Sequence, residues 1–221
     1  MIKAILFDLD NTLIDFMAMK RNSCEAAINA MVNAGLKVSK KKGMKILFQL
    51  YDRYGIEYQL IFEKFLQKTS GKVDYKILAH GIRAYRFEKE QNLQPYPGTI
   101  ETLRKLKKRR IKMAIISDAP RRAVWDRLTA MKIDGYFDAV ITMSDVRRQK
   151  TTSAPFNSAL KALKVKPEEA IMVGDRPERD VKTAKKLGIK TVFARYGNPD
   201  IGKSGADLEI KRIDEILNLI K

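Results

Sequence analysis

Short apolar runs alternate with longer amphipathic stretches through much of the chain. The first run extends from residue 2 to residue 7, interrupted only by Lys3, and ends at Asp8. Similar runs follow at residues 111–117, 137–142, 170–173 and 191–194, and β-branched or aliphatic side chains recur in most of them. Short, nearly continuous apolar runs are typical of strands that are buried on both faces of a sheet.

The spacing of apolar residues predicts helices between these strands. The predicted helical stretches are one around residues 104–106, then 122–131, 153–163 and 178–187, with Gly188 in the position of a C-terminal cap. Strands that alternate with helices imply right-handed crossover connections. The pattern therefore predicts an α/β fold, with a Rossmann-like parallel sheet and helices on both of its faces.

Residues 15–94 interrupt this alternation with an all-helical pattern. Apolar side chains three and four residues apart form four stripes, which we expect to make the core of a small helical bundle. The stripes are Cys24, Ala27, Ile28 and Met31; Met44, Leu47, Phe48 and Tyr51; Tyr58, Ile61, Phe62 and Phe65; and Tyr75, Leu78, Ile82 and Tyr85. The prolines within residues 94–98 are typical of a linker. The predicted domains are therefore 1–14 with 95–221, and the helical domain 15–94.

Length and cysteine content narrow the class of protein. The 221 residues suffice for one sizeable core and a small accessory unit. The single cysteine, Cys24, permits no internal disulfide, which favours a reducing compartment and hence the cytoplasm. No segment approaches the roughly 20 apolar residues of a membrane span, so no membrane partner is expected.

The formal net charge of +18 has two interpretations. One is a polyanionic partner such as nucleic acid, and the other is a solvated basic surface that favours small anions. The excess is spread along the chain, and the short clusters at 40–42 and 107–110 are not interleaved with aromatic residues as in a single-strand binding surface. The pattern therefore disfavours nucleic acid as a partner, and it indicates no oligomeric state.

Residues capable of chemistry follow the ends of four predicted strands. They are Asp8 and Asp10 after the first, Ser117 and Asp118 after the second, Lys150 in the loop after the third, and Asp175 and Asp180 after the fourth. Ligands of parallel sheets bind beyond the carboxyl ends of the strands. We therefore expect these side chains to gather at one edge of the sheet.

The pair of carboxylates at Asp8 and Asp10 is suited to two kinds of chemistry. Mutual repulsion favours different protonation states, so that one carboxylate can act as nucleophile and the other as general acid and base. The same negative charge attracts a hard cation, and Mg²⁺ commonly pairs one or two carboxylates with a substrate phosphate. Lys150 would offset charge on phosphoryl oxygens, and Ser117 would donate a hydrogen bond to them. Together these residues predict phosphoryl transfer.

In these residues the chain resembles the haloacid dehalogenase superfamily, on its phosphatase side. Residues 7–13, Phe-Asp-Leu-Asp-Asn-Thr-Leu, match the first family motif, Asp-x-Asp-x-Thr. Ser117 matches the second motif, Lys150 the third, and Gly174-Asp175 with Asp180 the fourth. The resemblance spans residues 1 to about 195, and the helical insert occupies the position of the family's helical cap domain.

The resemblance implies the catalytic roles. Asp8 would attack phosphorus and form an aspartyl-phosphate. Asp10 would protonate the leaving oxygen and then activate the water that hydrolyses the intermediate. Thr12 would help to orient the phosphoryl group, and Ser117 and Lys150 would hold its oxygens.

A metal site is implied in the same way. Asp8, the backbone carbonyl of Asp10 and Asp175 would bind Mg²⁺. Asp180 would support either the metal site or the third-motif lysine without binding the metal directly.

Two further features concern residues beside the motifs, namely predicted substrate contacts and a departure from the family pattern. Asn11 and Asp118 are predicted to contact the substrate. The third motif departs from the family pattern, because Thr151 follows Lys150 where proline is common and Arg147 stands where glycine is common. This departure could alter how the loop presents the lysine.

The predicted function is thus a magnesium-dependent phosphatase that hydrolyses a small-molecule phosphate monoester. One alternative keeps the fold and changes the reaction to phosphotransfer, mutase chemistry or dehalogenation. Asp10 argues against dehalogenation, because the dehalogenase branch lacks an acid at that position. Another alternative is a basic protein that binds nucleic acid or a protein partner on a hydrolase scaffold. The clustered acids argue against it, because a binder of polyanions gains nothing from them.

Overall fold

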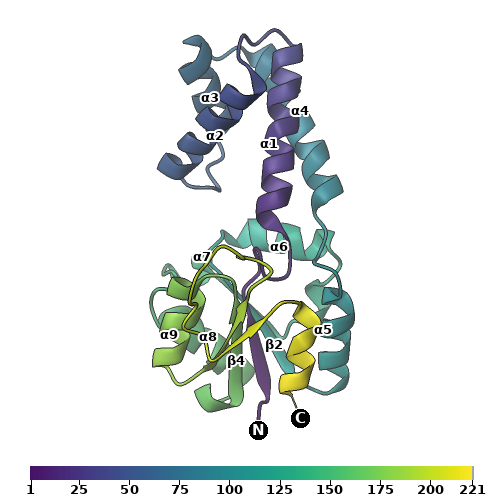
Figure 1. Cartoon of the computed structure of the whole chain (residues 1–221), viewed down its shortest axis with the longest axis vertical. Coiled ribbons are helices and arrows are strands. Elements are labelled where there is room, and N and C mark those ends of the chain that lie inside the picture. Colours follow the sequence, from purple (N-terminus) through teal and green to yellow (C-terminus); the bar gives the residue numbers. More distant parts are fainter. Residues whose placement is uncertain (221) are drawn as a thin grey trace. The chain divides into compact units, whose positions relative to one another are not determined.

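The computed structural model describes residues 1–220, and the chain forms two compact units. The first, called the core unit, contains Met1–Asp15 and the chain from Gln94 onward. The second, called the helical unit, is Phe16–Leu93. The core unit contains a sheet flanked by helices, whereas the helical unit contains helices joined by loops (Figure 1).

Six strands form the sheet of the core unit, in the order β3-β2-β1-β4-β5-β6, and every neighbouring pair is parallel. Their bounds are β1 Ala4–Phe7, β2 Lys112–Ser117, β3 Ala139–Thr142, β4 Ala170–Gly174, β5 Lys190–Ala194 and β6 Leu208–Ile210. In the centre, Ile5 of β1 lies opposite Met113 on one side and Ile171 on the other. Because all strands run in one direction, their carboxyl ends share one edge of the sheet. The predicted α/β fold with a parallel sheet is confirmed.

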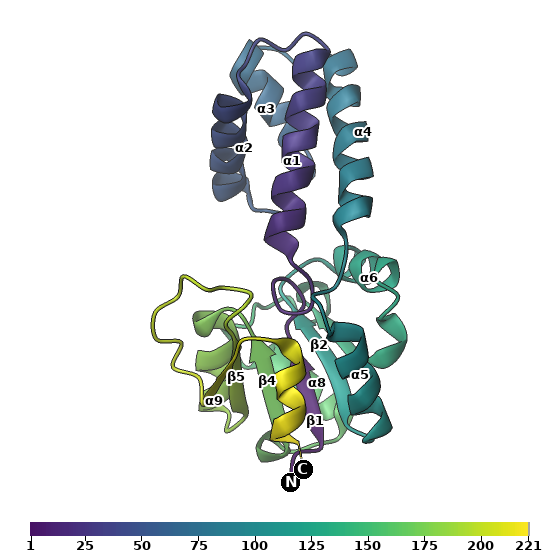
Figure 2. The ribbon, with the colours of Figure 1, turned by 45° about the vertical axis from the view of Figure 1, so that its right-hand side comes forward.

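Helices cover both faces of this sheet (Figure 2). On one face, α8 Ala154–Leu163 and α9 Lys182–Lys186 pack with Ala4 and Leu6 of β1 in a cluster that includes the fully buried Phe156. On the opposite face lie α5 Thr99–Lys108 and the 3-10 helix η4 Ile213–Leu219, which pack against each other. The other helical segments are α6 Arg121–Ala130, η1 Asp134–Tyr136, α7 Met143–Val146, η2 Pro167–Glu169 and η3 Pro177–Val181.

Two predicted elements of the core unit differ from the observed ones. The strand predicted at 137–142 begins only at Ala139, because the 3-10 turn Asp134–Tyr136 precedes it. The helix predicted at 178–187 is divided into a single π-helical turn, η3, and the short α9. Gly188 follows α9 with a left-handed φ of 80°, as expected of a C-terminal glycine. The three-residue strand β6 was not predicted, because so short a run has no distinctive pattern.

Four helices build the helical unit: α1 Phe16–Asn33, α2 Lys40–Tyr54, α3 Ile61–Ser70 and α4 Tyr75–Asn92. The long helices α1 and α4 pack side by side (Figure 2). At the start of α4, the Asp74 side chain accepts hydrogen bonds from the backbone of Lys76 and Ile77, which stabilises the helix terminus. Among residues 1–220, no helix has the length and apolar character required to cross a bilayer.

The buried core of this unit follows the first predicted stripe, since Cys24, Ala27, Ile28 and Met31 are all fully buried. Two expectations are wrong. Tyr58 packs against the core as expected, but it lies in the loop before α3 rather than on that helix. The reason is that α2 ends at Tyr54 and the chain needs several residues to reverse direction. Tyr75 is 76% exposed, because it is the first residue of α4 and lies at the margin of the bundle.

Candidate active site

Asp8 lies immediately beyond β1, the strand at the centre of the sheet. Its backbone nitrogen donates to the carbonyl of Val173 at 2.8 Å, which continues the pairing with β4 by one residue. The chain then turns sharply through Asn11, whose φ is 58°. Asparagine tolerates this left-handed conformation better than most residues with a side chain. The turn places Thr12 close to Asp8, and the Thr12 hydroxyl donates to Asp8 Oδ2 at 3.3 Å.

Lys150 is buried between two carboxylates. Its Nζ contacts Asp8 Oδ1, and it lies 2.6 Å from Asp180 Oδ1. Burial disfavours the charged ammonium, but Asp180 and Asp8 more than offset this effect, so the pKa of Lys150 is raised. The lysine therefore remains a cation that neutralises negative charge at the carboxyl end of β1.

Three buried acids form a cluster around this lysine. One carboxylate oxygen from each of Asp8, Asp175 and Asp180 lies within 4.8 Å of the others. Burial, followed by repulsion from Asp8 and Asp180, raises the pKa of Asp175 to about 8. The Oδ1 atom of Asp175 is buried and has no hydrogen-bond partner among residues 1–220. A buried carboxylate oxygen without a donor costs free energy, and a hard cation would satisfy it. The donor set therefore fits a divalent metal that prefers oxygen ligands.

Asp10 points to a different partner. Its Oδ2 accepts a hydrogen bond of 2.9 Å from Nη1 of Arg127, which belongs to α6. The Arg127 side chain is only 4% exposed, whereas that of Asp10 is 24% exposed. The pair thus places a partly accessible carboxylate in front of a buried guanidinium.

Ser117 and Asp118 follow β2, the neighbour of β1. Ser117 is buried, and its Oγ accepts a hydrogen bond from the backbone of Ala119 at 3.1 Å. The two carboxylate oxygens of Asp118 accept from the backbone nitrogen of Lys150 at 2.9 Å and from Nη1 of Arg179 at 3.2 Å. Asp118 therefore joins the loop that carries Lys150 to the segment after β4.

The order of these residues along a parallel sheet agrees with a family model. Residues 5–194 match the model described as haloacid dehalogenase-like hydrolase. The chain belongs to this family. The predicted family resemblance is therefore confirmed, and the protein is a hydrolase of the haloacid dehalogenase-like type.

Individual relatives of this hydrolase agree with that assignment. It is 34% identical over 223 residues to a glyceraldehyde 3-phosphate phosphatase of Methanocaldococcus jannaschii, covering 100% of this chain and 98% of the relative. It is also 34% identical to the enzyme of the same name from Pyrococcus furiosus, covering 100% of this chain and 93% of the relative. A putative beta-phosphoglucomutase from Thermotoga maritima superposes with a TM-score of 0.78 at 21% identity, covering 100% of both chains. At that identity, the last similarity establishes the fold alone.

The structure brings five of the predicted residues of the hydrolase into one connected group: Asp8, Thr12, Lys150, Asp175 and Asp180. The roles predicted for the site residues stay predictions at this point. Two further observations bear on them. Asn11 is 7% exposed, which leaves little of it accessible to a substrate. Asp118 uses both carboxylate oxygens to bind the protein itself, so its described contacts are structural.

Residues after β5 contact the turns that carry the candidate site residues, but they belong to no motif that sequence reasoning could use. The Tyr196 hydroxyl donates to the backbone carbonyl of Thr12 at 2.7 Å, and burial raises the pKa of this phenol, so it stays a donor. Asn198 donates through Nδ2 to the carbonyl of Asp175 at 3.2 Å. The segment thus holds the turns after β1 and β4 together. Gly197, between these two residues, packs directly against the carbonyl of Asn11.

Gly197→Ala is expected to destabilise the hydrolase. A Cβ added at Gly197 would lie 1.7 Å from the carbonyl oxygen of Asn11, so the turn after Asp8 would have to move. Overpacking of this kind costs about 1–3 kcal/mol of unfolding free energy, which urea denaturation measures. Gly202→Ala is the matched control, because a Cβ there meets no atom within 4 Å. Equal stabilities of the two variants would contradict the expectation.

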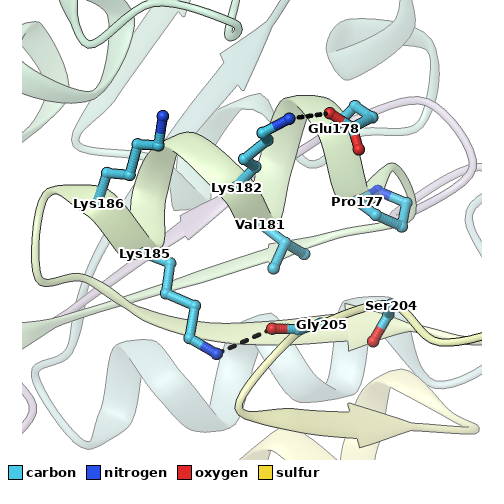
Figure 3. A pocket seen from close by; sticks show the side chains of 8 residues that line it. All are labelled: Pro177, Glu178, Val181, Lys182, Lys185, Lys186, Ser204 and Gly205. Carbon is cyan, nitrogen blue, oxygen red and sulfur yellow. Dashed lines mark hydrogen bonds and ion pairs between the residues drawn. The ribbon is translucent and has the colours of Figure 1, made fainter.

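A separate pocket of about 420 Å³ lies beside η3 and α9 (Figure 3). Two of its lysines are already engaged: Lys182 pairs with Glu178 at 3.0 Å, and Lys185 donates to the backbone oxygen of Gly205 at 2.9 Å. The clustered acids and Lys150 do not line this pocket. This cavity is therefore separate from the acids that cluster at the carboxyl end of β1.

Proposed function

We propose that the chain is a magnesium-dependent phosphatase that hydrolyses a small phosphate monoester through an aspartyl-phosphate on Asp8. The observation that carries the proposal is the buried contact of Asp8 with Lys150, next to the two further acids Asp175 and Asp180. A carboxylate held by a cation and a hydroxyl in a buried site is oriented for attack on an electrophile. Family membership supports the same chemistry.

Catalysis is proposed to proceed in two displacements at phosphorus. A carboxylate oxygen of Asp8 forms a bond to phosphorus while the bond to the leaving oxygen breaks, and Asp10 gives its proton to that oxygen. Asp10, now a carboxylate, then takes a proton from water as the water oxygen bonds to phosphorus. The bond between Asp8 and phosphorus breaks with its electron pair returning to Asp8, and inorganic phosphate leaves. Lys150 and Ser117 stabilise the phosphoryl oxygens throughout.

Magnesium would be held by Asp8, Asp175 and the backbone carbonyl of Asp10. The unsatisfied Oδ1 of Asp175 supports this assignment, because a buried carboxylate oxygen with no donor is a ready ligand for a hard cation. When bound, the ion would neutralise charge on the phosphate and on the acids. Asp180, which lies against Lys150, would keep that lysine in place rather than bind the metal.

A three-carbon phosphorylated aldehyde is the substrate that the relatives suggest. The two phosphatases named above are each 34% identical to this chain over its whole length, and both are named for glyceraldehyde 3-phosphate. We take glyceraldehyde 3-phosphate as the first ester to test. A polyanion such as nucleic acid is not required to explain the basic surface, since the proposed substrate is itself an anion.

The cytoplasm is the proposed location. Cys24 is a free and buried thiol, and burial raises its pKa to about 11. Such a thiol is unreactive and belongs to the core of the helical unit. A chain with this single thiol gains nothing from an oxidising compartment.

The test is release of inorganic phosphate from a panel of monoesters that includes glyceraldehyde 3-phosphate, with Mg²⁺ and with EDTA. We expect release with Mg²⁺ and a loss of at least about 100-fold with EDTA, because the ion neutralises charge that the acids alone would repel. Reactions without protein are needed as controls, because triose phosphates lose phosphate spontaneously.

Three outcomes would contradict the proposal. Undiminished release in EDTA would remove the metal from the mechanism. Phosphate that appears on an acceptor, or only when an acceptor is supplied, would replace the hydrolase with a phosphotransferase. The absence of release from every ester would leave the phosphatase without support.

A further inference from the structure

Arg127 occupies a place on α6 where an apolar side chain would be expected. Val124 and Leu128 of the same helix are fully buried, and Arg127 is 3% exposed among them. By contrast, Arg122 near the start of this helix is exposed. Burial of a guanidinium is unfavourable unless a hydrogen-bonded partner compensates the charge. An arginine at this position therefore indicates a specific pairing, and the pairing observed is with Asp10 at 2.9 Å.

Hydrogen bonds of the turn itself hold the backbone around Asp10. Asn11 donates its backbone nitrogen to the carbonyl of Ile14 at 2.7 Å, and the Tyr196 hydroxyl fixes the carbonyl of Thr12 at 2.7 Å. These bonds define the turn that follows Asp8. Arg127 in turn fixes the orientation of the Asp10 side chain. The planar donors of a guanidinium restrict the orientation of the carboxylate that they bind.

We propose that Arg127 is a positioning residue that orients the Asp10 carboxyl group toward the leaving oxygen of the substrate. This inference rests on the proposed function, in which Asp10 is the general acid and base. The orientation matters because proton transfer requires the acid within hydrogen-bond reach of the oxygen that receives the proton.

Direct binding of the phosphate by Arg127 is disfavoured by exposure. The arginine side chain is 4% exposed and that of Asp10 is 24% exposed, so the carboxylate is the accessible member of the pair. Lys150, which contacts Asp8, already supplies a cation at the nucleophile. Arg127 therefore acts through Asp10, and its removal should affect the step that Asp10 assists.

The choice of leaving group provides the test. An alkyl phosphate such as glyceraldehyde 3-phosphate needs a proton on its leaving oxygen, whereas 4-nitrophenyl phosphate releases a stable phenolate that needs little assistance. General acid catalysis contributes about 100-fold to 10,000-fold, so a misdirected acid in Arg127→Met should lower kcat/KM for the alkyl ester by roughly 10-fold to 100-fold. For the aryl ester, the expected loss is below about threefold on the same grounds.

Matched variants separate positioning from general disruption. Arg122→Met removes an exposed arginine from the same helix and should leave both substrates unaffected. Arg127→Lys keeps the charge but not the planar fork, so it should restore part of the loss on the alkyl ester. If Arg127→Met does not fold, Arg127→Lys carries the same comparison between the two esters.

Each result decides between defined alternatives. An equal loss on both esters would show that Arg127 supports the phosphate or the fold rather than the acid, and it would overturn the inference. Full activity of Arg127→Met on the alkyl ester would overturn it as well. A wild-type protein that releases phosphate from neither ester would instead be a failure of the proposed function.

Discussion

Asp8→Asn is expected to lower phosphate release by at least about 10,000-fold, because loss of a covalent nucleophile removes most of the catalytic advantage of an enzyme. The amide is nearly isosteric with the carboxylate but is a poor nucleophile, so the site keeps its shape and loses its chemistry. Lys150 would still have Asp180 as a partner at 2.6 Å, and we therefore expect the variant to fold. Steady-state phosphate release, with circular dichroism to confirm folding, measures the effect.

The control for this change is Asp200→Asn. Asp200 is exposed and lies outside the clustered acids, so its amide variant should retain full activity. Phosphatase activity near the wild-type level in Asp8→Asn would remove Asp8 from the mechanism. Covalent trapping offers an independent check, in which the protein is denatured during turnover and assayed for bound phosphate. The Asp8 carboxylate of the wild type can form an acyl phosphate, whereas the amide of Asp8→Asn cannot.

Lys150→Met is expected to impair both activity and stability. Without its ammonium group, Asp8 and Asp180 face each other with no buried cation between them. Removing one partner of a buried ion pair typically costs about 3–5 kcal/mol of unfolding free energy. Loss of a preorganised positive charge at phosphoryl oxygens should lower turnover by about 1,000-fold. Urea denaturation in EDTA and phosphate release in Mg²⁺ measure the two effects separately.

The stability loss should depend on pH in a direction that the buried acids determine. Burial raises the pKa of Asp180 to about 6, and Lys150 opposes this rise, so removing the lysine shifts the pKa further upward. A carboxyl group with a raised pKa favours the folded state below its unfolded value of about 3.9, and this contribution is lost as the pH rises through the folded value. The difference between wild type and Lys150→Met should therefore be smallest near pH 4 and largest near pH 8.

Lys161→Met is the control for this comparison, because Lys161 is exposed near the end of α8. Its stability should follow that of the wild type at every pH. If the loss of unfolding free energy in Lys150→Met is the same at pH 4 and at pH 8, the lysine stabilises the fold by packing alone. If Mg²⁺ reduces this loss of unfolding free energy, the ion neutralises the same buried carboxylates that Lys150 neutralises in the wild type.

Sequence reasoning predicted that the candidate site residues would gather at one edge of the sheet because of the way a parallel sheet is built. Asp8, Ser117 and Asp175 each end or follow a short apolar run, and parallel strands bring such positions to one edge. Apolar side chains repeat every two residues on one face of a strand and every 3.6 residues on one face of a helix. This repeat is a local property, so it can be read from the sequence of a segment alone. The same reasoning was weaker at element boundaries. The start of β3 and the division between η3 and α9 depend on turn geometry, which the apolar pattern does not report.

The sequence by itself therefore determined the α/β fold class, the all-helical character of residues 16–93, and the family to which the chain belongs. The tertiary structure alone decided the partner of Asp10. Arg127 is 117 residues away along the chain and appears in the sequence as one more basic residue of a helix. The close approach of Gly197 to Asn11 was equally hidden. Pairings of this kind arise when distant segments fold together, and local periodicity carries no information about which distant side chain will complete a buried charge.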